Sequence, residues 1–186
     1  MHQAGEKCAK AAMILLVVGG AWTYTCAAAQ QTDSLSILKA LFDARNAHNA
    51  DAAAAFFAED ATITNTNGHK TTGRENIKKI MEGDSAGNAQ FVLGSPKIMG
   101  DRITFTDLTT RDVFRKLEVA PVRIEGEAIV QGGKIKSFIV YLPPDSIGKI
   151  EAACKTPKGD GISIGGLPCL EYIPRAKAHA ESLRTW

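Results

Sequence analysis

The sequence has few of the residue groupings that usually identify a reaction class. Its 22 lysines and arginines nearly balance 20 aspartates and glutamates, and no basic face interleaved with aromatic residues is visible, so a nucleic-acid partner is not expected. The four histidines are isolated, and no His, Asp or Glu cluster has metal-ligand spacing, so we expect no metal. No glycine-rich phosphate loop or Gly-x-Ser-x-Gly elbow follows a predicted strand. We therefore expect no cofactor, and exclude nucleotide binding and serine hydrolysis.

The amino terminus carries a more definite pattern. Two lysines precede an apolar run over residues 11–22, and Ala27–Ala29 stand just before Gln30. Basic, apolar and small-residue zones in this order are typical of a secretory signal peptide, so we predict cleavage near Gln30 and a secreted or periplasmic protein. The run is shorter than the roughly 20 residues that span a bilayer. Extended through Ala29, it gives an uncleaved membrane anchor as the alternative.

Two of the four cysteines, Cys154 and Cys169, remain after removal of this leader. In an oxidising compartment, an even number of cysteines in a loop-rich tail indicates a disulfide. The alternative is two separate buried thiols. We expect the bond between Cys154 and Cys169.

Helices are predicted in the first part of the mature chain. Asp33 and Ser34 can cap a helix whose apolar residues recur at three- and four-residue spacing, ending near residue 49. Asp51 can cap a second, alanine-rich helix that continues through Phe57.

A short strand and a third helix follow. Residues 61–64 form a β-branched run, and Asn67–Gly68 is typical of a hairpin turn. The third helix begins after Gly73, carries apolar residues on one side and ends near Gly83–Asp84.

From residue 90 the apolar period changes toward two, which predicts four strands in one antiparallel sheet. Their predicted ranges are Gln90–Ile98, Arg102–Thr110, Pro121–Val130 and Lys134–Leu142.

Residues 112–117 interrupt the middle pair of these strands. Phe114 and Leu117 are spaced for one helical turn over the sheet, a candidate lid. After the last strand we expect a short helix at 146–153, a loop at 155–168 and a closing helix that starts at Pro174.

This order resembles the nuclear transport factor 2-like superfamily, and so do particular segments. Leu41–Asp51 and Phe56–Ile63 resemble the opening of the superfamily's domain, Gly73–Ile77 resembles the start of its third helix, and Gly133–Ile135 resembles its final hairpin. The resemblance covers roughly residues 34–142. It is specific for fold, whereas one fold hosts many functions.

The resemblance, to SnoaL-like and ketosteroid isomerase-like members, implies an α+β fold: a cone-shaped, curved antiparallel sheet packed on three amino-terminal helices. We divide the chain into a signal peptide at 1–29, a nuclear transport factor 2-like domain at 30–145 and a disulfide-closed helix and loop extension at 146–186.

The catalytic groups of the isomerase-like relatives are not found at the matching positions. Leu41 stands at the tyrosine position, Asn65 at the general-base position and Gly126 near the protonated aspartate. An amide is no proton acceptor near neutral pH. A late-strand carboxylate of the epoxide-hydrolase-like and cyclase-like members matches Val140, so the resemblance implies no water activation there.

What the resemblance leaves is an apolar cone with a few neutral polar groups, which either holds a pocket or is filled as a dry core. The predicted lining is Leu41, Phe57, Ile63, Asn65, Phe91, Thr104, Phe105, Phe114, Phe138 and Val140.

The opposite face of the sheet carries both charge and apolar residues. Glu125 and Glu127 alternate away from the apolar face of their strand, which favours a charge ladder over a catalytic pair. Ile129, Ile139 and Tyr141 lie on the same outer face, which suggests that something covers it. Since related cones dimerise through this surface, the resemblance implies a homodimer.

We interpret the chain as an exported SnoaL-like protein that binds a small apolar ligand, its reaction unassigned. One alternative is an isomerase- or lyase-type enzyme acting on a cyclic or polyketide-like substrate, with Asn65 orienting a carbonyl and Asp107 or Asp112 supplying a carboxylate. The other is a non-catalytic dimeric interaction module. A buried carboxylate in the pocket would favour the enzyme.

Overall fold

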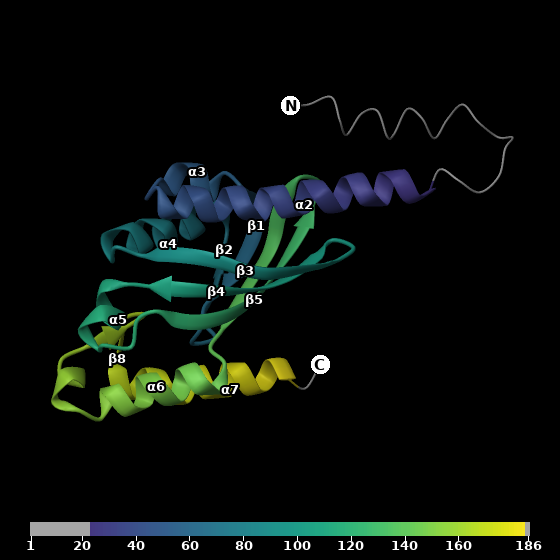
Figure 1. The fold of residues 1–186 in the computed structure, drawn as a ribbon. Helices are drawn as coiled ribbons and strands as arrows, with labels where there is room; N and C mark the ends of the chain where they lie inside the picture. Colours follow the sequence, from purple (N-terminus) through teal and green to yellow (C-terminus); the bar gives the residue numbers. More distant parts are fainter. Residues whose placement is uncertain (1–22, 185–186) are drawn as a thin grey trace, which may run out of the picture.

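A curved six-stranded sheet forms the body of the protein, with helices α2, α3 and α4 at one side and α6 and α7 at its opposite end (Figure 1). The computed structural model describes residues 23–184. The helices are α2 (Thr23–Asn46), α3 (Ala50–Ala54), α4 (Arg74–Ala86), α5 (Asp112–Lys116), α6 (Pro144–Cys154), η1 (Pro157–Gly159) and α7 (Cys169–Arg184). The strands are β1 (Phe57–Thr64), β2 (Lys70–Thr72), β3 (Gln90–Met99), β4 (Arg102–Thr110), β5 (Val122–Gln131), β6 (Lys134–Tyr141), β7 (Ser163–Ile164) and β8 (Leu167–Pro168).

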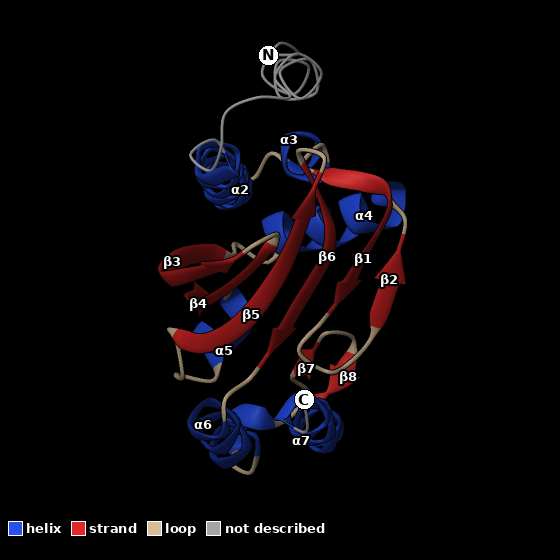
Figure 2. Ribbon diagram, turned by 90° about the vertical axis from the view of Figure 1, so that its right-hand side faces the viewer, coloured by secondary structure: helices blue, strands red, loops and turns tan. Residues whose placement is uncertain are grey.

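The sheet is mixed and not wholly antiparallel. Its order is β2-β1-β6-β5-β4-β3, and β3 to β6 form the predicted antiparallel meander, with ends within one residue of those expected. β1 pairs with β6 in parallel, with Ile63 opposite Phe138 (Figure 2). The sequence prediction missed this parallel pair because it did not include β1 in the sheet.

The helix starts were predicted less well than the helices themselves. Asp33 and Ser34 do not cap α2, since the helix already runs from Thr23. Asn49, and not Asp51, caps α3: its side chain accepts a hydrogen bond from the backbone N–H of Ala52 across 3.0 Å. The strand predicted at 61–64 starts at Phe57, where a helix was expected.

The predicted hairpin turn and third helix are present. Gly68 adopts a φ of 78°, and its N–H donates to Asn65 O across 2.8 Å, so β1 turns into β2 at the expected place. α4 begins directly after Gly73 and runs to Ala86. The leader prediction falls mainly on residues 1–22, which lie outside the described residues.

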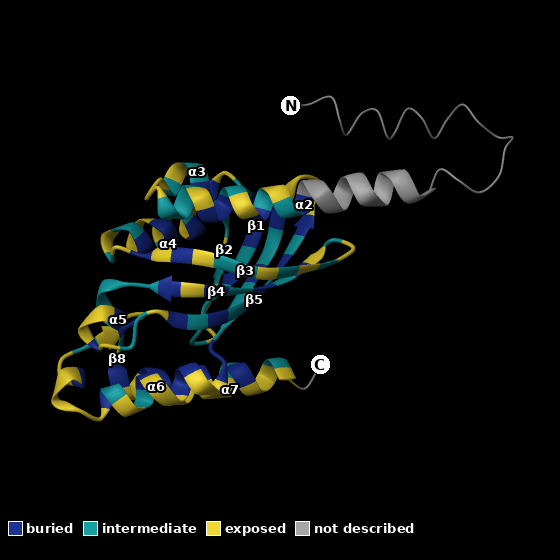
Figure 3. Ribbon diagram, in the orientation of Figure 1, coloured by how far each residue is buried: buried dark blue, intermediate teal, exposed yellow. Residues whose placement is uncertain are grey.

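Two clusters of buried apolar residues hold the structure together (Figure 3). The first lies between α2, α4 and the inner face of the sheet, and includes the edge-to-face contacts of Phe42 with Phe91 and Phe105. The second joins α5 and the end of β6 to the carboxyl-terminal extension, where Leu117 and Tyr172 are almost fully buried. Val140 borders both clusters.

The extension is more ordered than its composition indicates. The predicted disulfide between Cys154 and Cys169 is present and joins the end of α6 to the start of α7. The predicted loop contains η1 and the β7–β8 hairpin. α7 starts at Cys169 and includes Pro174, so Pro174 was a wrong start. Across residues 23–184, no helix is both long and apolar enough for a membrane span.

Candidate functional site

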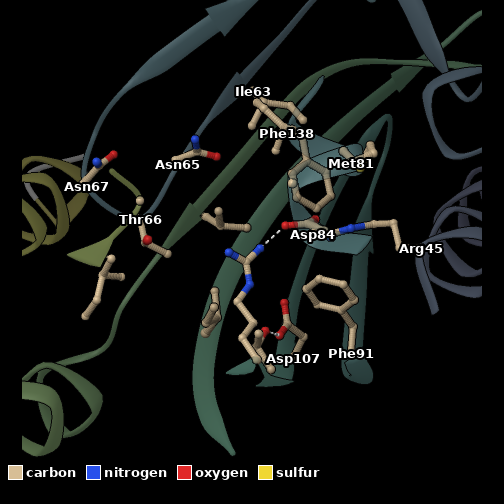
Figure 4. Close-up of a pocket in the computed structure, with 18 of the residues that line it drawn as sticks. Arg45, Ile63, Asn65, Thr66, Asn67, Met81, Asp84, Phe91, Asp107 and Phe138 are labelled. Carbon is tan, nitrogen blue, oxygen red and sulfur yellow. Dashed lines mark hydrogen bonds and ion pairs between the residues drawn. The ribbon is translucent and has the colours of Figure 1, made fainter. Parts of the chain in front are cut away.

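A cavity of about 360 Å³ lies inside the cone, bounded by α2, α4, the inner face of the sheet and the extension (Figure 4). This volume is at the lower end of the range for small-molecule sites, ~300–1,000 Å³. Most of its wall is apolar, from Ile63, Ile80, Met81, Phe91, Phe114, Ile124, Phe138, Val140 and Ile164. The cone is therefore not filled as a dry core.

The structure brings six of the ten predicted lining residues to this cavity: Ile63, Asn65, Phe91, Phe114, Phe138 and Val140. Leu41, Phe57 and Phe105 belong to the packed core instead. Thr104 is on the wrong face: it alternates with the buried Ile103 and Phe105, and lines a separate hollow on the outer side of the sheet.

Among the three predicted polar candidates, Asp107 is the residue that the structure buries in the cavity wall. Its side chain comes from the inner face of β4 and is 3% exposed. Burial raises the pKa of Asp107 to about 6, against the opposing hydrogen bond from the Thr109 hydroxyl and the charges of Arg45 and Arg111. Asp112 lies outside the cavity, half-exposed, in an ion pair with Arg115 at 2.7 Å.

Asn65 lines the other side of the cavity, directly after β1. Its backbone N–H donates to His69 O across 2.9 Å, which closes the turn between β1 and β2. His69 itself is exposed. The amide side chain can donate to a ligand carbonyl, but it does not act as a base.

A buried ionic network lies beside Asp107. Arg45 Nη2 donates to Asp84 Oδ2 across 2.7 Å, and Arg111 Nη2 contacts Asp84 Oδ1. One carboxylate is thus shared between two guanidinium groups, and the Arg45 guanidinium carbon lies 3.7 Å from the centre of the Phe91 ring. Asn46 anchors this end of α2, since its side chain exchanges two 2.8 Å hydrogen bonds with the backbone of Phe91.

The network of Arg45, Asp84 and Arg111 was missed in the sequence, although its spacing gives a signal. Arg45 continues the buried stripe of α2 after Leu38, Leu41 and Phe42, and Asp84 continues that of α4 after Ile77 and Met81. A charged residue in an apolar helical stripe is buried with a partner, because an unpaired buried charge is costly. Asp107 and Thr109 extend the inward alternation of Ile103 and Phe105 in the same way.

The extension supplies part of the cavity wall. Ile164 and Gly165 of the β7–β8 hairpin, with Tyr172 of α7, lie on it. The Tyr172 hydroxyl is 2.7 Å from Thr66 Oγ1, and burial raises the pKa of Tyr172 to about 12. The α7 helix is therefore joined to the β1–β2 hairpin at the edge of the cavity.

The outer face of the sheet carries the predicted charge ladder. Arg123 Nη1 lies 3.1 Å from Glu125 Oε1, and Arg102 Nη1 lies 3.3 Å from Glu127 Oε2. Both glutamates therefore point away from the cavity. Within residues 23–184, no three His, Cys, Asp or Glu side chains are placed to hold a metal ion.

The described residues form an α+β cone with a polar cluster inside an apolar cavity. Residues 38–126 match the family model of the SnoaL-like domain. This segment is therefore similar to SnoaL-like domains, and the fold of the chain is nuclear transport factor 2-like. A search among curated proteins gave no significant match.

Solved structures agree with this fold. A nuclear transport factor 2-like protein of unknown function from Mesorhizobium loti is 21% identical over 61% of this chain and 93% of its own, with a TM-score of 0.54. SalBIII, an epoxide hydrolase/cyclase-like enzyme in pyran ring formation in salinomycin, is 16% identical over 62% and 94%, with a TM-score of 0.53. A proposed ketosteroid isomerase from Kribbella flavida is 17% identical over 61% and 80%, with a TM-score of 0.51. At these identities the likeness concerns the fold alone.

Proposed function

We propose that the cone binds a small cyclic or polyketide-like molecule and that Asp107 transfers a proton to and from it, in an isomerase- or lyase-type reaction. The observation that carries this proposal is a buried carboxyl group in the wall of an apolar cavity, with its pKa raised to about 6. A general base works best when its pKa is near the working pH. Near neutral pH, Asp107 is mostly ionised and able to accept a proton.

The surroundings of Asp107 fit this role. Apolar walls such as Phe91 and Phe138 lower the local polarity, which strengthens electrostatic effects on a developing charge. Asn65 and Arg111 also lie on the wall and can donate hydrogen bonds to an oxygen that becomes negative when a neighbouring carbon loses its proton. SalBIII shares the fold and takes part in pyran ring formation, which is the reason for proposing a cyclic molecule for this chain.

The test uses 5-nitrobenzisoxazole, a neutral bicyclic molecule. A base removes its C–H proton while the ring N–O bond breaks, which leaves a coloured nitrophenolate and needs no redox partner. We expect the wild-type chain to accelerate this elimination by about 10²–10⁴-fold over acetate at equal concentration, with a rate that rises with pH through about 6. Asp107→Asn should abolish the acceleration, and Asp43→Asn, an exposed change on α2, should retain it.

Two outcomes would contradict the catalytic proposal. An inactive wild type would leave the cavity as a binding site only. Equal rates in wild type and Asp107→Asn would place the proton transfer on another group. Circular dichroism of both variants shows whether a lost rate reflects lost folding.

We propose, secondly, that the protein forms a homodimer through the outer face of the sheet. Val92 and Leu108 lie opposite each other on β3 and β4, and are 64% and 43% exposed. Sedimentation velocity should show a dimer that Leu108→Lys converts to a monomer. Leu170→Lys, at an exposed position on α7, is the matched control. A monomeric wild type at micromolar concentration would exclude this dimer.

We also propose that the protein acts outside the cytoplasm, secreted or periplasmic. The leader pattern of residues 1–29 supports this, and so does the Cys154–Cys169 disulfide, because such bonds persist in oxidising compartments. Amino-terminal sequencing of exported protein should find a start near Gln30. Retention of Met1 in a membrane fraction would indicate the anchored alternative.

A further inference from the structure

The charges around the cavity balance only when Asp107 is ionised. Arg45 from α2 and Arg111 after β4 share Asp84 from α4, so this trio carries one net positive charge. Asp107 from β4 also lies on the cavity wall, and the charges of Arg45, Arg111 and Asp84 all shift its pKa. A protonated Asp107 leaves the cavity wall with a charge of +1, and an ionised Asp107 leaves it neutral.

The guanidinium groups also keep unused donor capacity. Arg45 is 9% exposed, and its buried Nε has no hydrogen-bond partner within the described residues. Arg111 contacts Asp84 through Nη2 and remains 34% exposed at the cavity wall. A guanidinium has five N–H donors in a planar fork that matches a carboxylate. Arg111 is therefore placed to receive an anionic group from the cavity.

We infer that the natural ligand is a monocarboxylate with an apolar body, that its carboxylate binds Arg111, and that Asp107 takes up one proton when it binds. This inference rests on the proposed function and names the ligand class for it: Asp107 is ionised and accepts a proton from a neutral molecule, whereas beside a bound carboxylate it is protonated and acts first as the proton donor. At about 360 Å³, the cavity has more than twice the volume of the ~150 Å³ cavity that holds one benzene ring, so it takes a body of about two rings.

Proton uptake follows from like-charge repulsion. A carboxylate bound at Arg111 supplies the negative charge that otherwise comes from ionised Asp107, and two close carboxylates share a proton more readily than either holds one alone. The groups that face Asp107 are Arg45, Asp84, Arg111 and the Thr109 hydroxyl. Because binding and protonation are linked reciprocally, ligand affinity should fall as pH rises above about 6, by up to about tenfold per pH unit.

The experiment compares 2-naphthoate with its neutral amide, 2-naphthamide, by calorimetry on the full chain between about pH 5.5 and pH 8. We expect naphthoate to bind at least about tenfold more tightly than the amide at the acidic end. Its affinity should fall with rising pH. Titrations at about pH 7, where free Asp107 is ionised, should report uptake of close to one proton when buffers of different ionisation enthalpy are compared.

Three variants test which residues cause the effect, and a fourth is the control. Arg111→Gln should lose the preference for naphthoate, and Arg111→Lys should keep part of it. Asp107→Asn should bind naphthoate with no pH dependence in this range. Arg115→Gln, a change in the surface pair with Asp112, should behave as wild type.

Equal binding of acid and amide, no naphthoate binding at millimolar concentration, or a preference that survives in folded Arg111→Gln would overturn the inference. Its failure is distinguishable from failure of the proposed function. Elimination of 5-nitrobenzisoxazole without naphthoate binding removes only the anionic ligand class. Proton-linked naphthoate binding without elimination removes only the catalytic role of Asp107.

Discussion

Arg45 donates to Asp84 across 2.7 Å, and the two residues are 39 positions apart in the sequence. The pair joins α2 to α4 inside the cone, where both side chains are almost fully removed from solvent. Since Arg111 binds the second oxygen of the same carboxylate, the Asp84 side chain holds three separate elements together.

Replacing Asp84 by Asn should therefore destabilise the fold strongly. The change removes the carboxylate that is paired with the buried Arg45, and breaking a buried pair in this way costs about 3–5 kcal/mol. Urea unfolding at neutral pH measures the loss. Glu82→Gln on the same helix is the control, because Glu82 is exposed and its ion pair with Lys78 is long, at 4.0 Å. The free energy of unfolding of this variant should stay within about 0.5 kcal/mol of wild type. A loss below about 1 kcal/mol for Asp84→Asn would show that the trio is dispensable.

The raised pKa of Asp107 makes stability depend on pH in a defined direction. Its pKa is about 6 in the folded protein and 3.8 in the unfolded chain, so the folded state holds the proton more firmly. The stabilisation of the folded state by this proton is complete below pH 3.8 and is lost as pH rises through about 6. As pH rises from 4.5 to 7.5, the free energy of unfolding of Asp107→Asn should therefore increase by about 2 kcal/mol relative to that of wild type. The comparison removes the opposite effect of Glu151, whose pKa Lys177 and Lys155 lower to about 2. Parallel stability curves for the two proteins would contradict the assignment.

Removing the disulfide should loosen the extension. The bond closes a loop with a sequence separation of 15, for which chain entropy predicts about 3 kcal/mol. Cys154→Ser with Cys169→Ser should lower the free energy of unfolding by about 2–4 kcal/mol, and reduced wild type should match the double variant. Alkylation of unreduced, unfolded protein checks the bond itself: two labelled thiols at these positions would show that it is absent.

Two glycine substitutions should have opposite effects. A Cβ at Gly126 would lie 2.5 Å from Phe105 Cζ and 3.0 Å from Ile139 O, and the Phe105 ring is held by Phe42 and Phe138, so Gly126→Ala should cost about 1–3 kcal/mol. Gly148 lies exposed in α6 with open space around it, and Gly148→Ala should stabilise by about 0.5–1 kcal/mol. Thermal unfolding of both variants measures these changes in stability. Equal effects would mean that Gly126 is not tightly packed.

The sequence predicted those parts of the structure that depend on local spacing. The alternation from Val122 to Val130 and the turn at Asn67–Gly68 fix strands and faces without reference to the rest of the chain. The parallel pairing of Ile63 with Phe138 has no local signal, because each strand could equally pair elsewhere. Most of the apolar residues that line the cavity could be predicted for the same reason, because they follow the alternation of the strands.

The charged part of the site could not be predicted from local spacing alone. Asp107 was named as one of two carboxylate candidates, but its burial depends on Arg45, Asp84 and Arg111, which come from three places in the chain. Its position in an apolar stripe indicates that a charged residue faces the core, whereas the partner that it meets there depends on the tertiary structure. Thr104 shows the reverse case, since its assignment failed by a shift of one residue in the alternation.

The parallel pairing of β1 with β6 also bears on the order of events during synthesis. Phe57 pairs with Ile135, so one edge of β1 has no sheet partner until the last strand of the cone has left the ribosome. Strand pairing between such distant segments raises contact order and slows folding. The meander from β3 to β6 can pair sequentially as it emerges, whereas the closed cone, and with it the cavity, has to wait for the chain from β1 through β6 to be complete.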